Sequence, residues 1–228
     1  QVSIDIVHGV LFRSDLLFST IIVLLLPMQD FVVLLYVLAL CILFAFGLHG
    51  LVMVYYYHKT KAFQHPPAQH PEELPVVTIQ LPLYNELYVV DRLIESVCAM
   101  EYPREKMEIQ VLDDSTDETV HATKALVEEY RSRGFDISYV HRVDREGYKA
   151  GALKNGMLTS RGEFVAIFDA DFVPKKDFLT NTITHFHNPK VGMVQTRWEH
   201  LNEEYSFLTR AQALALDGHF VIEQQVRN

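Results

Sequence analysis

The chain has 228 residues, of which 49% are hydrophobic, and its formal net charge is −9. Residues 58–228 carry 26 of the 29 acidic and 19 of the 20 basic side chains, which leaves this part with a net charge of −7. Such an acidic domain lacks the clustered Lys and Arg needed to coat a phosphate backbone, so nucleic acid is excluded as a partner. The two cysteines, Cys41 and Cys98, are too few for a disulfide framework or a zinc site.

Residues 31–57 form an apolar run without a single charged side chain. A helix of this length exceeds the roughly 20 residues needed to cross about 30 Å of hydrocarbon. The run ends in three tyrosines, and Lys59 and Lys61 follow closely, as is typical of a membrane interface. The positive-inside rule then predicts an integral membrane protein with residues 58–228 in the cytoplasm.

A second apolar stretch covers residues 10–27 and is closed by the segment 27–30, Pro-Met-Gln-Asp. Its uncharged part is short, so either a second span in a tight hairpin or an interfacial helix fits the pattern. We expect a second membrane span at residues 10–27, so that residues 1–57 together form an N-terminal membrane region. The chain begins at Gln1 and stops at Asn228 inside a helical pattern, which indicates a fragment truncated at its C-terminus.

Residues 58–75 contain four prolines and predict a stiff linker. From residue 76 to 228, strand and helix patterns alternate. The predicted strands are 76–81, 107–112, 137–141, 164–168 and 191–196, and the predicted helices are 86–100, 117–133, 148–158, 175–186 and 204–225. This order predicts an α/β domain with a mostly parallel, Rossmann-like sheet covered on both faces, whose ligands bind beyond the carboxyl ends of the strands.

Polar residues follow the first two predicted strands. After the first comes P-L-Y-N-E, in which Tyr84 presents a flat ring on which a base can stack and Asn85 can cap the next helix. The second ends in D-D-S-T-D, where Asp113 and Asp114 are ligand candidates and either Asp117 or Thr116 is interpreted as a helix cap. Three carboxylates this close repel one another, so we expect a compensating partner, which is a base or ribose donor, a metal or the N-terminus of the following helix.

The fourth predicted strand runs directly into Asp169-Ala170-Asp171. Alternate residues of an extended chain point the same way, so both carboxylates can reach one site. Oxygen ligands of this kind suit Mg²⁺ or Mn²⁺ bridging a diphosphate. Before this strand, the segment R-E-G-Y-K-A-G-A-L-K-N-G at 145–156 starts a helix, where Lys149 and backbone N–H groups are candidates for an anion site. Taken alone, that segment favours a close-packed helix with a solvated lysine.

The motifs P-L-Y-N-E, V-L-D-D-S-T-D, G-Y-K-A-G-A-L-K and F-D-A-D-F occur in this order, and together they resemble family 2 glycosyltransferases with the GT-A fold. The residues that make up these motifs most resemble those of the membrane-bound cellulose-synthase-like and mannan-synthase-like branch, and the resemblance covers residues 75–228. The resemblance implies a nucleotide-sugar site in which Asp171 and Asp169 hold Mg²⁺ or Mn²⁺ and the donor is bound by Tyr84, Glu86, Asp113, Asp114, Lys149 and Asp169.

The resemblance also implies the reaction, an inverting transfer of a hexose from UDP-glucose or GDP-mannose to a polysaccharide or lipid acceptor. A base deprotonates the acceptor hydroxyl, and the metal stabilises the departing diphosphate. Members of this branch carry that base in a Thr-Glu-Asp-like motif, followed by a Gln-x-x-Arg-Trp motif, and this chain shows neither. The catalytic base is therefore expected downstream of Asn228, and the chain is expected to hold the donor half of the site and to be inactive alone.

Two weaker candidates for acceptor-side chemistry are present. The segment 195–198, Gln-Thr-Arg-Trp, has the wrong spacing for the second motif, and it is interpreted as a strand end that shapes the acceptor side. Asp217 and His219 are possible bases, although a helix-surface or packing role is the expected one.

Two alternatives remain open from the sequence. Asp169 and Asp171 also fit the strand-ending D-x-D-x-(T/V) pattern of haloacid-dehalogenase-like phosphatases, as nucleophile and acid/base. The order of the motifs argues against that class, because the nucleophile motif usually opens its domain. A membrane-tethered module that binds nucleotide sugars without catalysis is the non-enzyme alternative.

Overall fold

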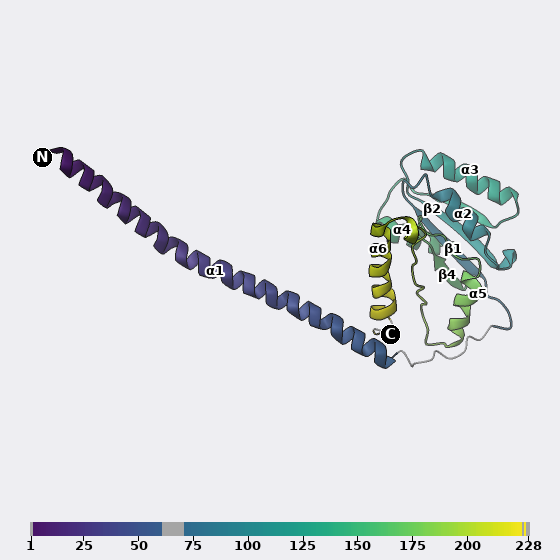
Figure 1. The fold of residues 1–228 in the computed structure, drawn as a ribbon. Helices are drawn as coiled ribbons and strands as arrows, with labels where there is room; N and C mark the ends of the chain where they lie inside the picture. Colours follow the sequence, from purple (N-terminus) through teal and green to yellow (C-terminus); the bar gives the residue numbers. More distant parts are fainter. Residues whose placement is uncertain (1, 61–70, 225, 227–228) are drawn as a thin grey trace. The chain divides into compact units, whose positions relative to one another are not determined.

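The computed structural model describes the backbone of residues 2–60, 71–224 and 226, and the side chains of 29–59, 71–222, 224 and 226. These residues fall into two compact units (Figure 1). One is an α/β unit within residues 66–195, and the other is a helical unit drawn from residues 1–65 and 196–228. The predicted linker, 58–75, lies mostly outside the described residues.

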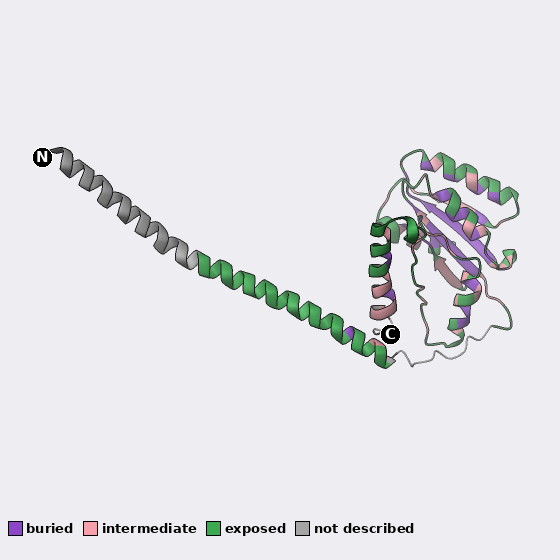
Figure 2. Ribbon diagram, in the orientation of Figure 1, coloured by how far each residue is buried: buried purple, intermediate pink, exposed green. Residues whose placement is uncertain are grey.

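In the helical unit, α1 (Val2–Thr60) is one continuous helix. Its segment Gln29–Lys59 is 31 residues long with a mean hydropathy of 2.9, and its side chains are almost all exposed (Figure 2). By length and composition this segment is able to cross a membrane. The helix continues through residues 27–30, where the sequence predicted a turn. The side chains of the predicted second span, 10–27, lie outside the described residues.

The helical unit also contains the C-terminal helices. Helix α6 (Phe207–Asp217) begins with a capping box, in which the Ser206 hydroxyl accepts a hydrogen bond of 3.1 Å from the Thr209 N–H. It runs directly into the π-helical segment η4 (Gly218–Gln224), and the short 3₁₀ helix η3 (Glu203–Tyr205) precedes it. The predicted helix 204–225 is thus divided into pieces.

The α/β unit is built on a four-stranded, fully parallel sheet with the strand order β3-β2-β1-β4. Residue 77 pairs with residue 107 on one side and with residue 164 on the other. Because the strands are parallel and in register, their carboxyl ends lie together at the same end of the sheet. The strands are β1 (Val77–Leu83), β2 (Met107–Asp113), β3 (Ile137–His141) and β4 (Phe164–Ile167).

Helices and 3₁₀ turns lie between these strands and after β4. Helix α2 turns Val90, Leu93, Ile94 and Val97 inward, and each of these side chains is at most 2% exposed. The helices are α2 (Val90–Cys98), α3 (Thr119–Ser132), α4 (Tyr148–Met157) and α5 (Phe178–Ile183), with 3₁₀ turns η1 (Arg104–Lys106) and η2 (Thr184–His187).

The two central strands have one apolar and one polar face, both buried. The odd-numbered residues of β1 and residues 107, 109 and 111 of β2 belong to the main hydrophobic core together with α2. On the other face, Thr78 Oγ1 donates a 2.6 Å hydrogen bond to Glu108, and Gln80 Nε2 donates one of 3.0 Å to Gln110. Strand alternation explains the separation, since successive side chains point to opposite faces.

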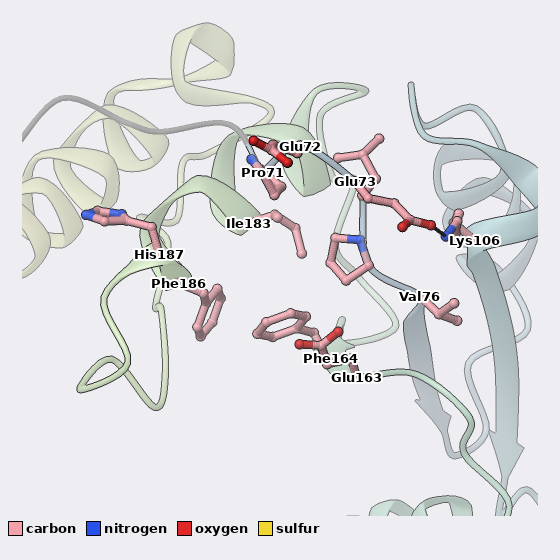
Figure 3. A pocket seen from close by; sticks show the side chains of 12 residues that line it. Pro71, Glu72, Glu73, Val76, Lys106, Glu163, Phe164, Ile183, Phe186 and His187 are labelled. Atoms are coloured by element: carbon pink, nitrogen blue, oxygen red, sulfur yellow. Dashed lines mark hydrogen bonds and ion pairs between the residues drawn. The ribbon is translucent and has the colours of Figure 1, made fainter.

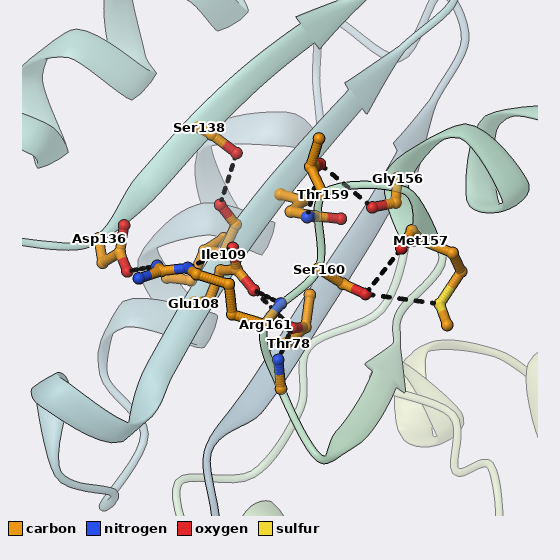
Figure 4. Close-up of polar contacts among 12 residues, drawn as sticks. Thr78, Glu108, Ile109, Asp136, Ser138, Gly156, Met157, Thr159, Ser160 and Arg161 are labelled. Carbon is orange, nitrogen blue, oxygen red and sulfur yellow. Dashed lines mark hydrogen bonds and ion pairs between the residues drawn. The ribbon is translucent and has the colours of Figure 1, made fainter.

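The polar face is covered by α4 and the segment after it (Figure 4). Gln80 Nε2 also donates to the carbonyl of Leu153 in α4 at 3.4 Å. A Cβ at Gly156 would lie 2.6 Å from Gln80 Nε2, so the absent side chain lets α4 approach the sheet this closely. The polar face thereby positions the helix that carries Lys149.

Strand β4 departs from the prediction in its burial. It is an outer strand of the sheet, and Ile167 is 47% exposed, whereas the sequence predicted a sheet covered on both faces. The strand predicted at 191–196 is not formed. That stretch is irregular and its Met193 is 78% exposed, so it gains neither backbone pairing nor apolar burial there.

Candidate functional site

A pocket of about 360 Å³ lies at the carboxyl ends of β1, β2 and β4. Its walls come from the loops after these strands and from the start of α4. This is the edge of the sheet at which open α/β folds bind ligands. Of the predicted site residues, the pocket brings together Tyr84, Glu86, Asp114, Lys149, Asp169 and Asp171.

Asp113 does not line this pocket. Its side chain is fully buried, with one carboxylate oxygen accepting from the Ser115 N–H at 2.9 Å and the other from the Tyr139 hydroxyl at 2.7 Å. Burial, followed by this hydrogen bond and the carboxylate charge, raises the pKa of Tyr139 well above its ordinary value. Neighbouring residues of an extended chain point in opposite directions, which separates Asp113 from Asp114.

The residue that compensates Asp114 is Arg142, which follows β3 and was not among the partners expected for the acidic cluster. Its Nε and Nη2 donate to the two carboxylate oxygens of Asp114 at 2.8 and 2.5 Å. Hydrogen bonding to Asp114 raises the pKa of Arg142. The third acid, Asp117, accepts from the Thr119 N–H at 2.9 Å, and hydrogen bonding to Thr119 lowers its pKa, consistent with the predicted capping role.

Asn85 has a different role from the predicted helix cap. Helix α2 begins later, at Val90, and Val89 in its N-cap position makes no side-chain cap. Asn85 instead has φ 56° and joins two loops. Its Oδ1 accepts from the Thr116 N–H at 2.9 Å, and its own N–H donates to Ser115 Oγ at 2.8 Å.

The carboxylates of the D-x-D motif have unequal surroundings. Asp169 forms an ion pair with Lys149 across the pocket. Asp171 is exposed and makes no hydrogen bond or ion pair with any residue that the structure describes. Within the described part of the chain, no group of three metal-ligating side chains occurs. The two carboxylates still fit a Mg²⁺ or Mn²⁺ site, because such ions commonly take one or two protein carboxylates with phosphate oxygens and water.

Arg145 is a pocket residue that the sequence analysis did not single out. Its guanidinium carbon lies 3.3 Å from the centroid of the Tyr84 ring and 5.2 Å from that of Tyr148. The guanidinium therefore covers a face of the ring that was predicted to stack on a base. No local pattern marks this arginine, because the contact joins two loops that are distant in sequence.

The proposed acceptor-side residues belong to the helical unit. Asp217 forms an ion pair of 2.9 Å with Arg197, and Trp198 lies against Phe220 with ring centroids 5.6 Å apart. Both contacts fit the packing role expected for this segment. The strand end predicted at 195–198 is not formed.

A larger pocket, of about 680 Å³, lies at the amino ends of the strands β1 and β4 (Figure 3). It is bordered by residues that precede β1 and begin β4, with Phe164, Ile183 and Phe186 on its apolar side and Glu73 paired to Lys106 at 2.7 Å on the other. None of the predicted site residues lines it.

The family model for "Glycosyl transferase family 2" matches residues 78–227. The chain belongs to glycosyl transferase family 2. Membership in this family decides against the phosphatase interpretation of Asp169 and Asp171.

Two curated plant relatives are similar to this family 2 chain. A probable glucomannan 4-beta-mannosyltransferase 4 from Oryza sativa subsp. japonica is 48% identical over 159 residues, covering 66% of this chain and 28% of that protein. Glucomannan 4-beta-mannosyltransferase 9 from Arabidopsis thaliana is 44% identical over 179 residues, covering 73% of this chain and 33% of that protein. The chain thus aligns with about a third or less of each relative.

A solved structure supports the GT-A fold of this family 2 chain. The mannosyltransferase PcManGT from Pyrobaculum calidifontis, in complex with GDP-Man and Mn²⁺, superposes with a TM-score of 0.59 at 28% sequence identity. The superposition covers 71% of this chain and 48% of that one. The parallel sheet with its helices is therefore the GT-A architecture that the motifs predicted.

Proposed function

We propose that this chain supplies the donor-binding part of a membrane-bound, inverting mannosyltransferase that uses GDP-mannose and extends a glucomannan-type polysaccharide. The observation that carries the proposal is the pocket, in which polar residues from three strand ends and from α4 converge. The names of the plant relatives and the GDP-Man complex of PcManGT support mannose and guanosine diphosphate. UDP-glucose is the alternative donor.

The charges in the pocket suit a nucleoside diphosphate. Lys149 supplies a cation for phosphate oxygens, and it is already held beside Asp169. Asp114 is fixed by Arg142, yet each carboxylate oxygen keeps a lone pair that can accept from a ribose hydroxyl. Glu86 offers a second acceptor after β1. The two hydrogen bonds that Asn85 makes with Thr116 and Ser115 hold together the loops that carry Tyr84 and Asp114.

Asp169 and Asp171 would hold the divalent cation in this proposal. Bound there, Mg²⁺ or Mn²⁺ supplies Lewis-acid stabilisation of the diphosphate leaving group. The residues of this chain bind and orient the donor, and Asp171 is available as a ligand because it has no partner among the described residues.

Inversion also requires a base that removes the proton of the acceptor hydroxyl. Asp217 is occupied by its ion pair with Arg197, which makes it a poor candidate. The location of the base downstream of Asn228 stays a prediction. Positioned proton transfer contributes roughly 10²- to 10⁴-fold in rate, so we expect donor binding without efficient sugar transfer by residues 1–228.

The binding and the transfer can be tested separately on the 228-residue chain in nanodiscs. Calorimetry with GDP, with and without Mn²⁺, should show metal-dependent binding, and a labelled GDP-mannose assay should show no transfer. Failure of the well-folded chain to bind any nucleoside diphosphate contradicts the donor site. Robust transfer would place the base within residues 1–228.

The membrane part of the proposal places the segment 29–59 across a bilayer and the α/β unit in the cytoplasm. Its support is the uncharged run 31–57 within this segment and the two lysines, Lys59 and Lys61, that follow the run. A reporter fused after residue 228 should be accessible from the cytoplasm. Accessibility from the luminal side alone would overturn the orientation.

A further inference from the structure

Arg145 is held between two aromatic side chains at the pocket. Its guanidinium carbon is 3.3 Å from the Tyr84 ring centroid, a separation typical of a guanidinium lying flat on the ring. A guanidinium that lies flat on a ring directs its N–H groups parallel to the ring plane, where they can reach acceptors beside the ring. Arg145 and Tyr84 both line the pocket.

The hydrogen-bonding capacity of Arg145 is unused, in contrast to that of Arg142. Arg142 donates to Asp114 and to the carbonyl oxygens of Glu146 and Tyr148. The Arg145 side chain makes no hydrogen bond or ion pair with any described residue, and its Nε is buried without a partner. An unpaired buried donor costs free energy, so a ligand that satisfies it gains affinity.

We propose that Arg145 recognises the base of the donor and makes the site selective for guanine nucleotides. This inference rests on the proposed function, because it names the base bound in the same pocket. Guanine presents two adjacent acceptors, O6 and N7, which a guanidinium fork contacts through two parallel hydrogen bonds. Uracil alternates acceptor and donor along its edge, so it cannot pair with both arms of the fork.

The surroundings favour the base over the diphosphate as the partner of Arg145. Lys149 already supplies a cation beside Asp169 at the end of the pocket formed by the D-x-D motif. Arg145 instead lies against the Tyr84 ring that follows β1. A purine whose O6–N7 edge lies in the plane of the guanidinium, beside the Tyr84 ring, can accept from both arms of the fork. Tyr84 accordingly acts as a platform for Arg145.

The test uses the 228-residue chain in nanodiscs and calorimetry with three nucleotides in the presence of Mn²⁺. GDP carries both acceptors, 7-deaza-GDP lacks N7, and UDP lacks the purine edge. The wild-type chain should bind GDP about 10-fold or more tightly than either of the other two. Equal affinity for GDP and UDP, or for GDP and 7-deaza-GDP, would overturn the inference.

Arg145→Lys keeps the charge and removes the fork. The GDP preference should fall to about one while the affinity for UDP stays within about 2-fold of wild type, because the base contact alone is lost. Arg133→Lys is the matched control, since Arg133 lies 4.7 Å from the Tyr130 ring and outside the pocket. It should leave all three affinities unchanged.

The outcomes separate this inference from the proposed function. If the folded wild-type chain binds no nucleoside diphosphate, both fail. If it binds GDP and UDP and Arg145→Lys retains the wild-type preference, Arg145 does not recognise the base, although the donor site stands. An equal loss of GDP and UDP affinity in Arg145→Lys would assign the residue a general structural role and would also overturn the inference.

Discussion

The side-chain oxygen of Asn85 accepts a 2.9 Å hydrogen bond from the backbone N–H of Thr116. This contact joins the loop after β1 to the loop after β2, and the Asn85 N–H reinforces it by donating to Ser115 Oγ at 2.8 Å. The backbone of Asn85 has φ 56°, a region that asparagine tolerates better than most residues. Two walls of the pocket therefore depend on one side chain and one unusual backbone conformation.

We predict that Asn85→Ala lowers the free energy of unfolding by about 2 kcal/mol, combining a lost hydrogen bond with the strain of a left-handed alanine. Asn85→Gly should cost less, because glycine accepts the positive φ. Urea unfolding of the chain in detergent measures both values. An alanine variant as stable as the glycine variant would show that the backbone conformation carries no strain.

Gly156→Ala should destabilise the α/β unit by about 1–3 kcal/mol, the range for overpacking. The added Cβ would lie 2.6 Å from Gln80 Nε2 and 2.8 Å from Gln110 Oε1, so either α4 or these buried side chains must shift. Gly192→Ala is the control, because nothing lies within 4 Å of its added Cβ. Comparison of urea midpoints tests the prediction, which fails if the two variants unfold alike.

Glu108 should make the stability of the α/β unit depend on acid pH. Burial by itself would raise its pKa, but hydrogen bonds from Thr78 and from the backbone and side chain of Arg161 outweigh burial and hold the pKa below its ordinary value. A carboxylate with a depressed folded-state pKa stabilises the fold above its unfolded-state pKa, and the stability is lost as the pH falls through the folded-state value.

The corresponding experiment follows the free energy of unfolding from pH 7 to pH 3. The wild type should lose stability below about pH 4.5, near the ordinary pKa of a glutamate. Glu108→Gln should show a smaller loss over that range and a lower stability at pH 7. The exposed Glu105 provides the control variant Glu105→Gln, which should follow the wild-type curve. If the free energy of unfolding depends on pH in the same way in the wild type and in both variants, Glu108 does not cause the loss of stability in acid.

Asp171→Asn should abolish the enhancement of GDP binding by Mn²⁺, because an amide lacks the charge that holds a divalent ion. Asp177→Asn is the control. That residue is also an exposed aspartate. It is the N-cap residue of α5, and its carboxylate accepts a 2.9 Å hydrogen bond from Asn181 Nδ2. Calorimetry with GDP at several Mn²⁺ concentrations distinguishes the two. If both variants keep the metal dependence, Asp171 is not a ligand.

Much of the fold and the site was accessible from local sequence patterns. Apolar strands bounded by turn residues predicted β1, β2 and β3 to within two residues at each end. Parallel strands then bring the residues that follow them to one edge, which predicted the meeting of Tyr84, Asp114 and Asp169 in one pocket. These predictions hold because hydrophobic periodicity and strand alternation are properties of a short segment.

Other features were decided by contacts between segments that are distant in sequence. The stretch 191–196 has a strand pattern, yet it gains no pairing partner and stays irregular. Asp113 and Asp114 are adjacent and chemically identical. Strand alternation turns them to opposite sides, and the positions of Tyr139 and Arg142 decide which side chain is buried and which lines the pocket. The same holds for Arg145, which local pattern left unmarked.

The sequence by itself determined which residues follow the strands and which family motifs they compose. The tertiary structure alone decided which of these side chains face the pocket, because direction depends on the register of neighbouring strands and on partners 26 to 31 residues away, as for Tyr139 with Asp113 and Asn85 with Thr116. The Arg145 contact with Tyr84 is of the same kind. A local pattern specifies the type of an element, whereas the pairing of loops is a balance of packing and hydrogen bonding over the whole unit.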